Sequence, residues 1–349
     1  MKRFFLVLTL LVFIVPVMAQ EEETVDLSGI KEYAAEHAAL MAENSAAFLE
    51  TVQTYYDLLA GYDFDYEAAY EAEGETLAEL VMTARENWLQ TSLYYELNEG
   101  IVAGTPSLAY YDVLIDAGAS AEDDPEEALE WTLTLPDGTE LESPGNLFHS
   151  LSEPTLYGTV DEFVGAEADL DGDGEVGPTE VLPDANLLLG VTQRLDEETQ
   201  NLVTAIDEWE PTEEDAFTAL VVMIPTMSEY FGQWKESAFV AGDEASEVSF
   251  VAASRLLDIV SILTGLRVTY DTVSPLVAES NPDLDAQIVT SFDDLQAYVD
   301  DLYEDEQEGV VFEAEEVDLL GTEAQDRAES LAALVAQAAD TLGITLELE

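Results

Sequence analysis

LSGIKEYAAEHAALMAENSAAFLETVQTYYDLL, residues 27–59, carries the clearest indication of the fold class. Its apolar side chains recur every three or four residues, which places them along one side of an α-helix. A helix of this length needs other helices to cover that side, so we expect a helical bundle. The positions on this stripe are Ile30, Tyr33, Ala34, His37, Leu40, Met41, Phe48, Val52 and Tyr55.

Helical periodicity continues on both sides of an irregular middle segment. Cap-and-proline signals at Pro183-Asp184, Pro211-Thr212 and Asn281-Pro282 mark three helix starts. Pro225 is expected to kink the helix in which it lies. The predicted fold class is therefore all-α, with two packed helical bundles. The expected helices after the first span about 66–96, 184–208, 212–240, 246–279, 283–304 and 322–343.

The middle segment is predicted to contain the non-helical structure. Glycine and proline punctuate residues 98–145, and Asp137-Gly138 between two short strand-like runs predicts a small β-hairpin. About 330 residues follow the N-terminal leader, enough for one large domain or two bundles. The predicted organisation is a signal peptide at 1–19, an acidic N-terminal tail at 20–26, an N-terminal helical bundle with the hairpin at 27–145, a linking segment with an EF-hand-type loop at 146–183 and a C-terminal helical bundle at 184–349.

The N-terminus predicts export. Lys2 and Arg3 precede the apolar stretch Phe4–Val15, Pro16 breaks it, and small residues end at Ala19. This is the pattern of a cleaved secretory signal. The alternative is an uncleaved anchor, but Phe4–Ala19 has 16 residues, fewer than the roughly 20 that a spanning helix needs. We therefore expect the mature protein in the periplasm or at the cell surface.

Charge and cysteine content exclude several classes of function. The mature chain keeps 7 of the 9 basic residues against 77 acids, a net charge of 7 − 77 = −70. Such a chain repels nucleic acid and anionic lipid and attracts cations, although a halophilic surface would look similar. The absence of cysteine removes disulfides and thiolate metal sites. The 48% hydrophobic content argues against disorder.

Residues 169–180, DLDGDGEVGPTE, fit the twelve-residue EF-hand template. Carboxylates stand at positions one, three, five and twelve, and glycine stands at the sharp turn in position six. Calcium takes six to eight hard oxygens, and alternate residues of a curled loop direct them at one centre. The alternative is an ordinary solvated acidic loop. The expected calcium ligands are Asp169, Asp171, Asp173, Glu175 through its backbone carbonyl, and Glu180.

A second set of candidate ligands is spread over three segments. His149 and Glu153 are four apart, which is one helical turn. Glu96 and Glu99 are three apart, and Asp112 and Asp116 are also one turn apart if helical. Nitrogen with several carboxylates suits iron, zinc or manganese rather than copper(I). Taken singly, each pair is better explained as an ordinary solvated surface pair than as a metal site. The other histidine, His37, lies on the first helical stripe and is expected to be packed.

Several segments resemble imelysin-like proteins, which include the EfeO-type periplasmic component of bacterial iron uptake. Tyr95–Ala103 (YELNEGIVA) resembles the family's Tyr-Glu-x-Ile-Glu-Pro-Val-Ala segment, and Asp112–Asp116 resembles the stretch that follows it. Phe148-His149 with Leu156-Tyr157-Gly158 is similar to Gly-Phe-His-x-x-Glu…Leu-Trp-Gly. The layout of the C-terminal helices is similar as well, so the resemblance spans nearly the whole mature chain.

The resemblance implies two helical bundles, export and a metal site near the His-x-x-Glu motif. His149 would be a ligand, with Glu96, Glu99 and Asp116 near it. Ser152 stands where the family pattern has Glu, and Glu153 lies one position later. The EF-hand-type loop is an insertion relative to that pattern. The family has also been called peptidase-like, but no His-Glu-x-x-His helix and no nucleophile-base pair is present, so we do not expect an enzyme.

Three functions remain open from the sequence. The first is an exported metal-binding protein of imelysin type for iron or other transition-metal uptake or scavenging, with calcium as a structural ion. The second is a calcium-stabilised extracellular binding or adhesion module. The third is a hydrolase using paired carboxylates, although no spacing singles out a pair. Expected cofactors are calcium and iron or zinc. Expected partners are metal ions and a membrane permease or surface partner, without nucleic acid or membrane insertion after signal cleavage.

Overall fold

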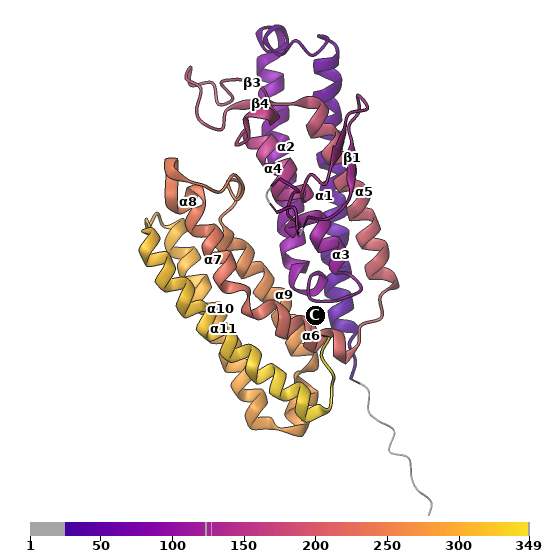
Figure 1. Cartoon of the computed structure of the whole chain (residues 1–349), viewed down its shortest axis with the longest axis vertical. Coiled ribbons are helices and arrows are strands. Elements are labelled where there is room, and N and C mark those ends of the chain that lie inside the picture. The colour runs from indigo at the N-terminus through magenta and orange to yellow at the C-terminus, as the bar shows by residue number, and fades with distance from the viewer. Residues whose placement is uncertain (1–24, 123, 127, 348–349) are drawn as a thin grey trace, which may run out of the picture.

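The computed structural model describes residues 25–122, 124–126 and 128–347 and shows an all-α fold with two small antiparallel strand pairs (Figure 1). The expected signal peptide at 1–19 and most of the expected tail lie outside the described residues. The α-helices are α1 (Ser28–Ala60), α2 (Tyr66–Val102), α3 (Ala109–Asp112), α4 (Glu153–Tyr157), α5 (Ala185–Glu208), α6 (Glu213–Met223), α7 (Met227–Glu236), α8 (Ala238–Ala241), α9 (Arg255–Ser280), α10 (Pro282–Gln307) and α11 (Ala314–Leu342), and the strands are β1 (Thr132–Thr134), β2 (Glu140–Glu142), β3 (Val164–Glu167) and β4 (Val181–Pro183).

Two groups of helices share one continuous apolar core. In the first group, α2 and α5 pack along α1, and in the second α6, α7 and α9–α11 pack together (Figure 1). Helix α9 joins the groups because it also packs against α2. The approach is close, since a Cβ added to Gly265 would lie 2.5 Å from the Leu97 carbonyl oxygen. The sequence predicts a C-terminal unit from residue 184 onward, but α5 packs with the N-terminal helices.

The first helix follows its predicted stripe. Ile30, Met41, Phe48 and Val52 are buried along α1, as the three-to-four spacing requires. The expected kink at Pro225 is confirmed, because a short 3₁₀ turn at Ile224–Thr226 separates α6 from α7. Proline there removes a backbone donor and crowds the preceding turn.

The helix expected at 246–279 begins only at Arg255, with the Ser254 side chain accepting a hydrogen bond from Leu256 N–H as the N-cap. Residues 245–254 form a loop instead, and Phe250 has a positive φ of 53°. The prediction was wrong for this stretch because three of its backbone N–H groups bind a distant carboxylate, that of Glu153, rather than helical carbonyls.

The predicted hairpin is confirmed, with Leu133 opposite Leu141 and the turn glycine, Gly138, at a φ of 89°. A second hairpin, β3–β4, was not predicted and brackets the acidic loop. Its strands are only 4 and 3 residues long, too short to show a clear alternation. Among the described helices, none has both the length and the apolar character that crossing a bilayer requires.

Candidate metal centre

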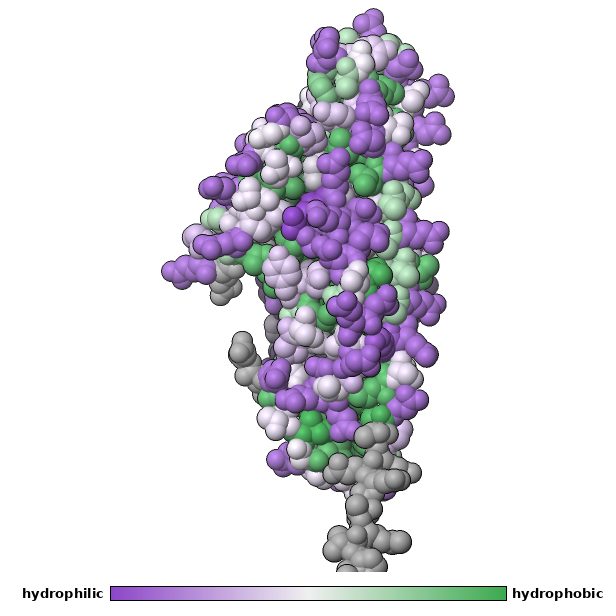
Figure 2. Space-filling model, turned by 90° about the vertical axis from the view of Figure 1, so that its right-hand side faces the viewer, coloured by the Kyte–Doolittle hydropathy of each residue, from purple (hydrophilic) through white to green (hydrophobic). Residues whose placement is uncertain are grey.

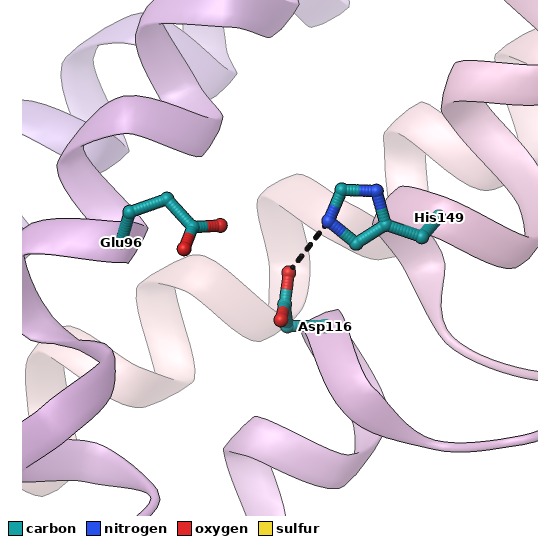
Figure 3. A group of neighbouring side chains, drawn as sticks. All are labelled: Glu96, Asp116 and His149. Carbon is teal, nitrogen blue, oxygen red and sulfur yellow. Dashed lines mark ion pairs between the residues drawn. The ribbon is translucent and has the colours of Figure 1, made fainter. Parts of the chain in front are cut away.

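Five ligand-type side chains meet inside the first group of helices, although they come from three separate segments. Glu96 and Glu99 lie on α2, Asp112 ends α3, and Asp116 and His149 each lie on a π-helical turn. All five are between 1% and 8% exposed. Figure 3 shows Glu96, Asp116 and His149 pointing toward one another. The structure thus brings together four of the five candidate transition-metal ligands, with Asp112 added to them.

Two π-helical turns, Val113–Ala117 and Leu147–Ser152, set the direction of Asp116 and His149. Asn146 caps the second turn, because its side-chain oxygen accepts hydrogen bonds from the N–H groups of His149 and Ser150. The Asn146 side-chain amide also donates to the Gly118 carbonyl, just after the first turn. These hydrogen bonds hold the two π turns against each other. Isolated π turns are rare in helices and are frequent at functional sites.

The two nitrogens of His149 have different partners. Nδ1 lies 2.9 Å from Glu153 Oε2, and Nε2 lies 3.0 Å from Asp116 Oδ1. A carboxylate only accepts hydrogen bonds, so Nδ1 carries the proton and Nε2 is the nitrogen that faces the cluster. This is the arrangement of a metal-binding histidine oriented by an outer carboxylate.

Glu153 was expected as a ligand, but its carboxylate is fully engaged elsewhere. Oε1 accepts from the N–H groups of Val251 and Ala252, and Oε2 accepts from Phe250 N–H and from His149. The structure therefore places Glu153 behind the His149 ring, where it orients the imidazole.

Several buried atoms of the cluster lack a hydrogen-bond partner. Among the described residues none is found for either carboxylate oxygen of Glu96, for Glu99 Oε2, for Asp116 Oδ1 or for His149 Nε2. The last two lie close together, but their contact does not have hydrogen-bond geometry. Buried polar atoms are nearly always paired, and leaving one unpaired costs on the order of 1–3 kcal/mol. A cation among these atoms would satisfy them.

Protonation takes the place of a cation when none is bound. Burial raises the pKa of Glu96 well above its usual value, and the charges of Asp258 and Asp116 raise it further. Burial, and then the charge of Asp116, raises the pKa of Glu99 to about 7. Burial raises the pKa of Asp112 as well. The acids are therefore held neutral in part because they are buried beside one another.

His149 and Asp116 shift in the opposite sense because they form an ion pair. Burial lowers the pKa of His149, but the charge of Asp116 and the contact with Glu153 outweigh it and bring that pKa to about 10. Burial raises the pKa of Asp116, and the positive charge of His149 outweighs it, so this pKa lies below its usual value. A metal ion at Nε2 would displace the proton that holds this pair together.

The sequence of the chain also matches a known protein family. The family model described as Imelysin, Peptidase_M75, matches residues 27–340. The chain belongs to the imelysin family. A search of curated proteins returns no match to this chain. Imelysin membership suggests a protein related to iron uptake, and the match runs through every segment that contributes to the cluster.

Ser152 of this imelysin stands where the resemblance to the family led us to expect Glu, and the structure shows what the serine contacts. Ser152 is fully buried, accepts a hydrogen bond from Trp88 Nε1 and donates one to the Leu147 carbonyl. It faces the core beside α2 rather than the cluster. Glu153, at the next position, supplies the carboxylate that holds His149.

Two residues beside the imelysin cluster were not predicted from the sequence to lie there. Arg255, at the start of α9, places its Nη1 3.1 Å from Asp258 Oδ2 and 3.7 Å from Glu96 Oε2. Tyr230 on α7 donates its hydroxyl to Glu99 Oε1 at 2.9 Å. The sequence feature that could have indicated Arg255 is its spacing from Asp258, which puts opposite charges on one face of an apolar helix.

His37 lies outside this cluster. It is half-buried on α1, its Nδ1 is 2.9 Å from the Tyr33 carbonyl oxygen, and its ring lies tilted against those of Tyr33 and Tyr94. These contacts agree with the expected packing role. Its position makes it a control for His149.

The acidic loop of this imelysin lies between β3 and β4. Ligand atoms of Asp169, Asp171 and Glu180 lie within 4.8 Å of one another. Asp173 is not part of that group, and its Oδ1 accepts a hydrogen bond from the N–H of Glu175, whose side chain is exposed. The first and last carboxylates bind backbone N–H groups across the loop, which curls it into a compact turn.

Proposed function

We propose that this imelysin binds a transition-metal cation, iron first among the candidates, through His149 Nε2 and the carboxylates of Glu96 and Asp116. The observation that carries the proposal is the set of buried, unpartnered atoms on these three residues, which lie within 4.8 Å of one another. One imidazole nitrogen with carboxylate oxygens suits iron, zinc or manganese. Glu153 fixes the imidazole, and its pairing with backbone N–H groups keeps it in place.

The proposed role is exported metal uptake or scavenging by binding, without catalysis. The excess of 77 acids over 9 basic residues in the whole chain supports it, because such a surface raises the local concentration of cations. Family membership supports the link with iron. A buried site that must release protons to load would let the protein pass its ion to a membrane permease or surface partner when the surroundings become more acidic.

The decisive experiment is a calorimetric titration of the calcium-saturated mature protein with Fe²⁺, Zn²⁺ and Cu²⁺ in turn, under anaerobic conditions. We expect stoichiometric binding of iron or zinc that is lost in His149→Ala and retained in His37→Ala, the matched control. Glu96→Gln, which keeps the volume of the side chain, should weaken binding without preventing folding. Absence of stoichiometric binding, or binding that His149→Ala leaves unchanged, would refute the proposal.

We also propose that the loop at 169–180 binds calcium as a structural ion. Its support is the match of the loop to the EF-hand spacing and the convergence of Asp169, Asp171 and Glu180. The short strands on either side suit a structural site that fastens a hairpin rather than a sensor built on two helices. Calorimetry with Ca²⁺ on the mature protein tests this, and no binding heat would contradict it.

A further inference from the structure

The buried cluster offers more ligands than one cation uses. Besides Glu96, Asp116 and His149, a second group of ligand atoms from Glu99, Asp112 and Asp116 also lies within 4.8 Å of one another. Asp116 belongs to both groups. Each group has three side chains from at least two segments of the chain, and all members of both are buried.

The second group contains an unsatisfied atom of its own. Glu99 is 3% exposed, and its Oε2 has no hydrogen-bond partner among the described residues. Its other oxygen, Oε1, is held at 2.9 Å by the hydroxyl of Tyr230. In the same way the Tyr95 hydroxyl holds Asp112 Oδ1 at 2.7 Å. Two phenols from the surrounding core thus fix these carboxylates, as outer hydrogen-bond partners fix the ligands of metal sites.

The charges of the cluster match two divalent ions. Arg255 lies 3.1 Å from Asp258, and the charges of that pair offset each other. This leaves the four carboxyl groups of Glu96, Glu99, Asp112 and Asp116. With one divalent cation, two of these groups would have to keep their protons, because an uncompensated buried charge is strongly unfavourable. Two divalent cations would balance all four as carboxylates.

We propose that the cluster holds two cations, the second bound by Glu99 and Asp112, with Asp116 bridging the two positions. This inference rests on the proposed function, since it assigns a second ion to the same cavity. Carboxylates shared between two ions are the usual way in which helical bundles hold metal pairs.

Metal counting tests the proposal on the full mature protein. Calcium at saturating concentration occupies the acidic loop, and equilibrium dialysis against Mn²⁺ with elemental analysis counts the ions bound elsewhere. We expect two Mn²⁺ per chain, and one in Glu99→Gln and in Asp112→Asn. Glu198→Gln, a buried carboxylate outside both groups, should keep two. Repeating the count in Glu180→Gln shows that the loop does not contribute.

Electron paramagnetic resonance of the Mn²⁺-loaded protein tests the bridge. We expect the spectrum of an exchange-coupled pair, replaced in Glu99→Gln by that of an isolated ion. One ion per chain that depends on His149 would overturn the second position and leave the proposed function standing, whereas no ion at all would overturn both. Two ions that Glu99→Gln and Asp112→Asn leave unchanged would also overturn it, and two ions without coupling would overturn the bridge.

Discussion

Glu153 decides which nitrogen of His149 faces the buried cluster. Its Oε2 lies 2.9 Å from Nδ1, and three backbone N–H groups hold the carboxylate from the other side. The interaction keeps a proton on Nδ1, so Nε2 is the nitrogen that faces Asp116 and that a metal ion would take in place of its proton. Glu153 would thus orient a ligand of the proposed metal site without contacting the ion itself.

Glu153→Gln should therefore weaken metal binding. The amide oxygen can still accept from the N–H groups of Val251 and Ala252, but the amide nitrogen would face His149 Nδ1 and favour the tautomer with the proton on Nε2. We expect the affinity for Zn²⁺ or Fe²⁺ to fall by about 10- to 100-fold, and the melting temperature to fall as well, because the Phe250 N–H loses its acceptor. Competition dialysis measures the affinity.

Glu140→Gln, an exposed substitution on β2, is the control and should leave the affinity unchanged. If Glu153→Gln binds metal as tightly as the unmodified protein, the orientation of His149 does not depend on Glu153.

The β3–β4 hairpin and its acidic loop contact α2, the helix that carries Glu96 and Glu99 of the cluster, and α4. The Tyr70 hydroxyl on α2 donates to the Asp169 carbonyl at 2.6 Å. Arg85, also on α2, donates through Nη2 to the Thr179 carbonyl at 2.6 Å and to the Leu156 carbonyl on α4 at 2.8 Å. An ion that stiffens the loop would therefore stabilise the contact between α2 and α4.

Calcium should accordingly raise the melting temperature by several degrees. A ligand at about 100 times its dissociation constant stabilises the folded state by roughly 2.7 kcal/mol. Glu180→Gln should lose most of this shift because it removes a carboxylate that closes the loop. Differential scanning calorimetry with and without Ca²⁺ measures it.

Glu175→Gln is the matched control, since position seven of the template contributes its backbone carbonyl. It should keep the full shift. An equal calcium effect in Glu180→Gln and the unmodified protein would show that Ca²⁺ acts on the acidic surface in general and not at this loop.

Across the whole molecule, acidic residues lie both on the surface, where they are solvated, and in the buried cluster. Figure 2 shows hydrophilic residues over much of one face, with hydrophobic residues in small separate groups. All seven basic residues of the described chain are engaged: six form ion pairs with acids, and Arg85 binds carbonyl groups. The buried acids of the cluster differ from the surface acids, because burial is the main cause of their raised pKa values.

The metal-free protein should lose stability as pH rises. Burial raises the pKa of Glu99 from 4.5 to about 7, so the folded state holds more protons than the unfolded chain across that interval. The pKa of His149, raised from 6.5 to about 10 by Asp116 and Glu153 against the effect of burial, acts in the same direction at higher pH. Stability present at low pH is thus lost as pH rises through these values.

We expect the melting temperature of the metal-free protein to fall between about pH 5 and about pH 8. Iron or zinc should restore it most strongly at the upper end, because bound metal replaces the lost protons. Thermal denaturation at both pH values measures this. Repeating it in about 1 M salt screens surface repulsion but not buried charge, and the dependence should remain. Glu99→Gln should flatten it, and a dependence that salt abolishes would assign the effect to the surface.

Features that depend on residues near one another in the chain could be predicted from the sequence. The three-to-four spacing of Met41, Phe48 and Val52 predicts α1 because a helix repeats every 3.6 residues, and Asp137-Gly138 predicts the hairpin because its turn requires positive φ. The kink at Pro225 follows from its missing N–H. The segments that resemble imelysins were sufficient to indicate the family.

Which side chains meet in the cluster could not be predicted from the sequence, because it depends on packing between distant segments. Asp116 and His149 are 33 positions apart, and their approach depends on two π turns held together by Asn146. The loop at 245–254 gives up helical hydrogen bonds for those to Glu153, and Arg255 joins the cluster from α9. The spacing of apolar residues indicates the structure of one segment of the chain. The meeting of side chains from different segments depends on how those segments are placed against one another, and long-range packing sets that placement.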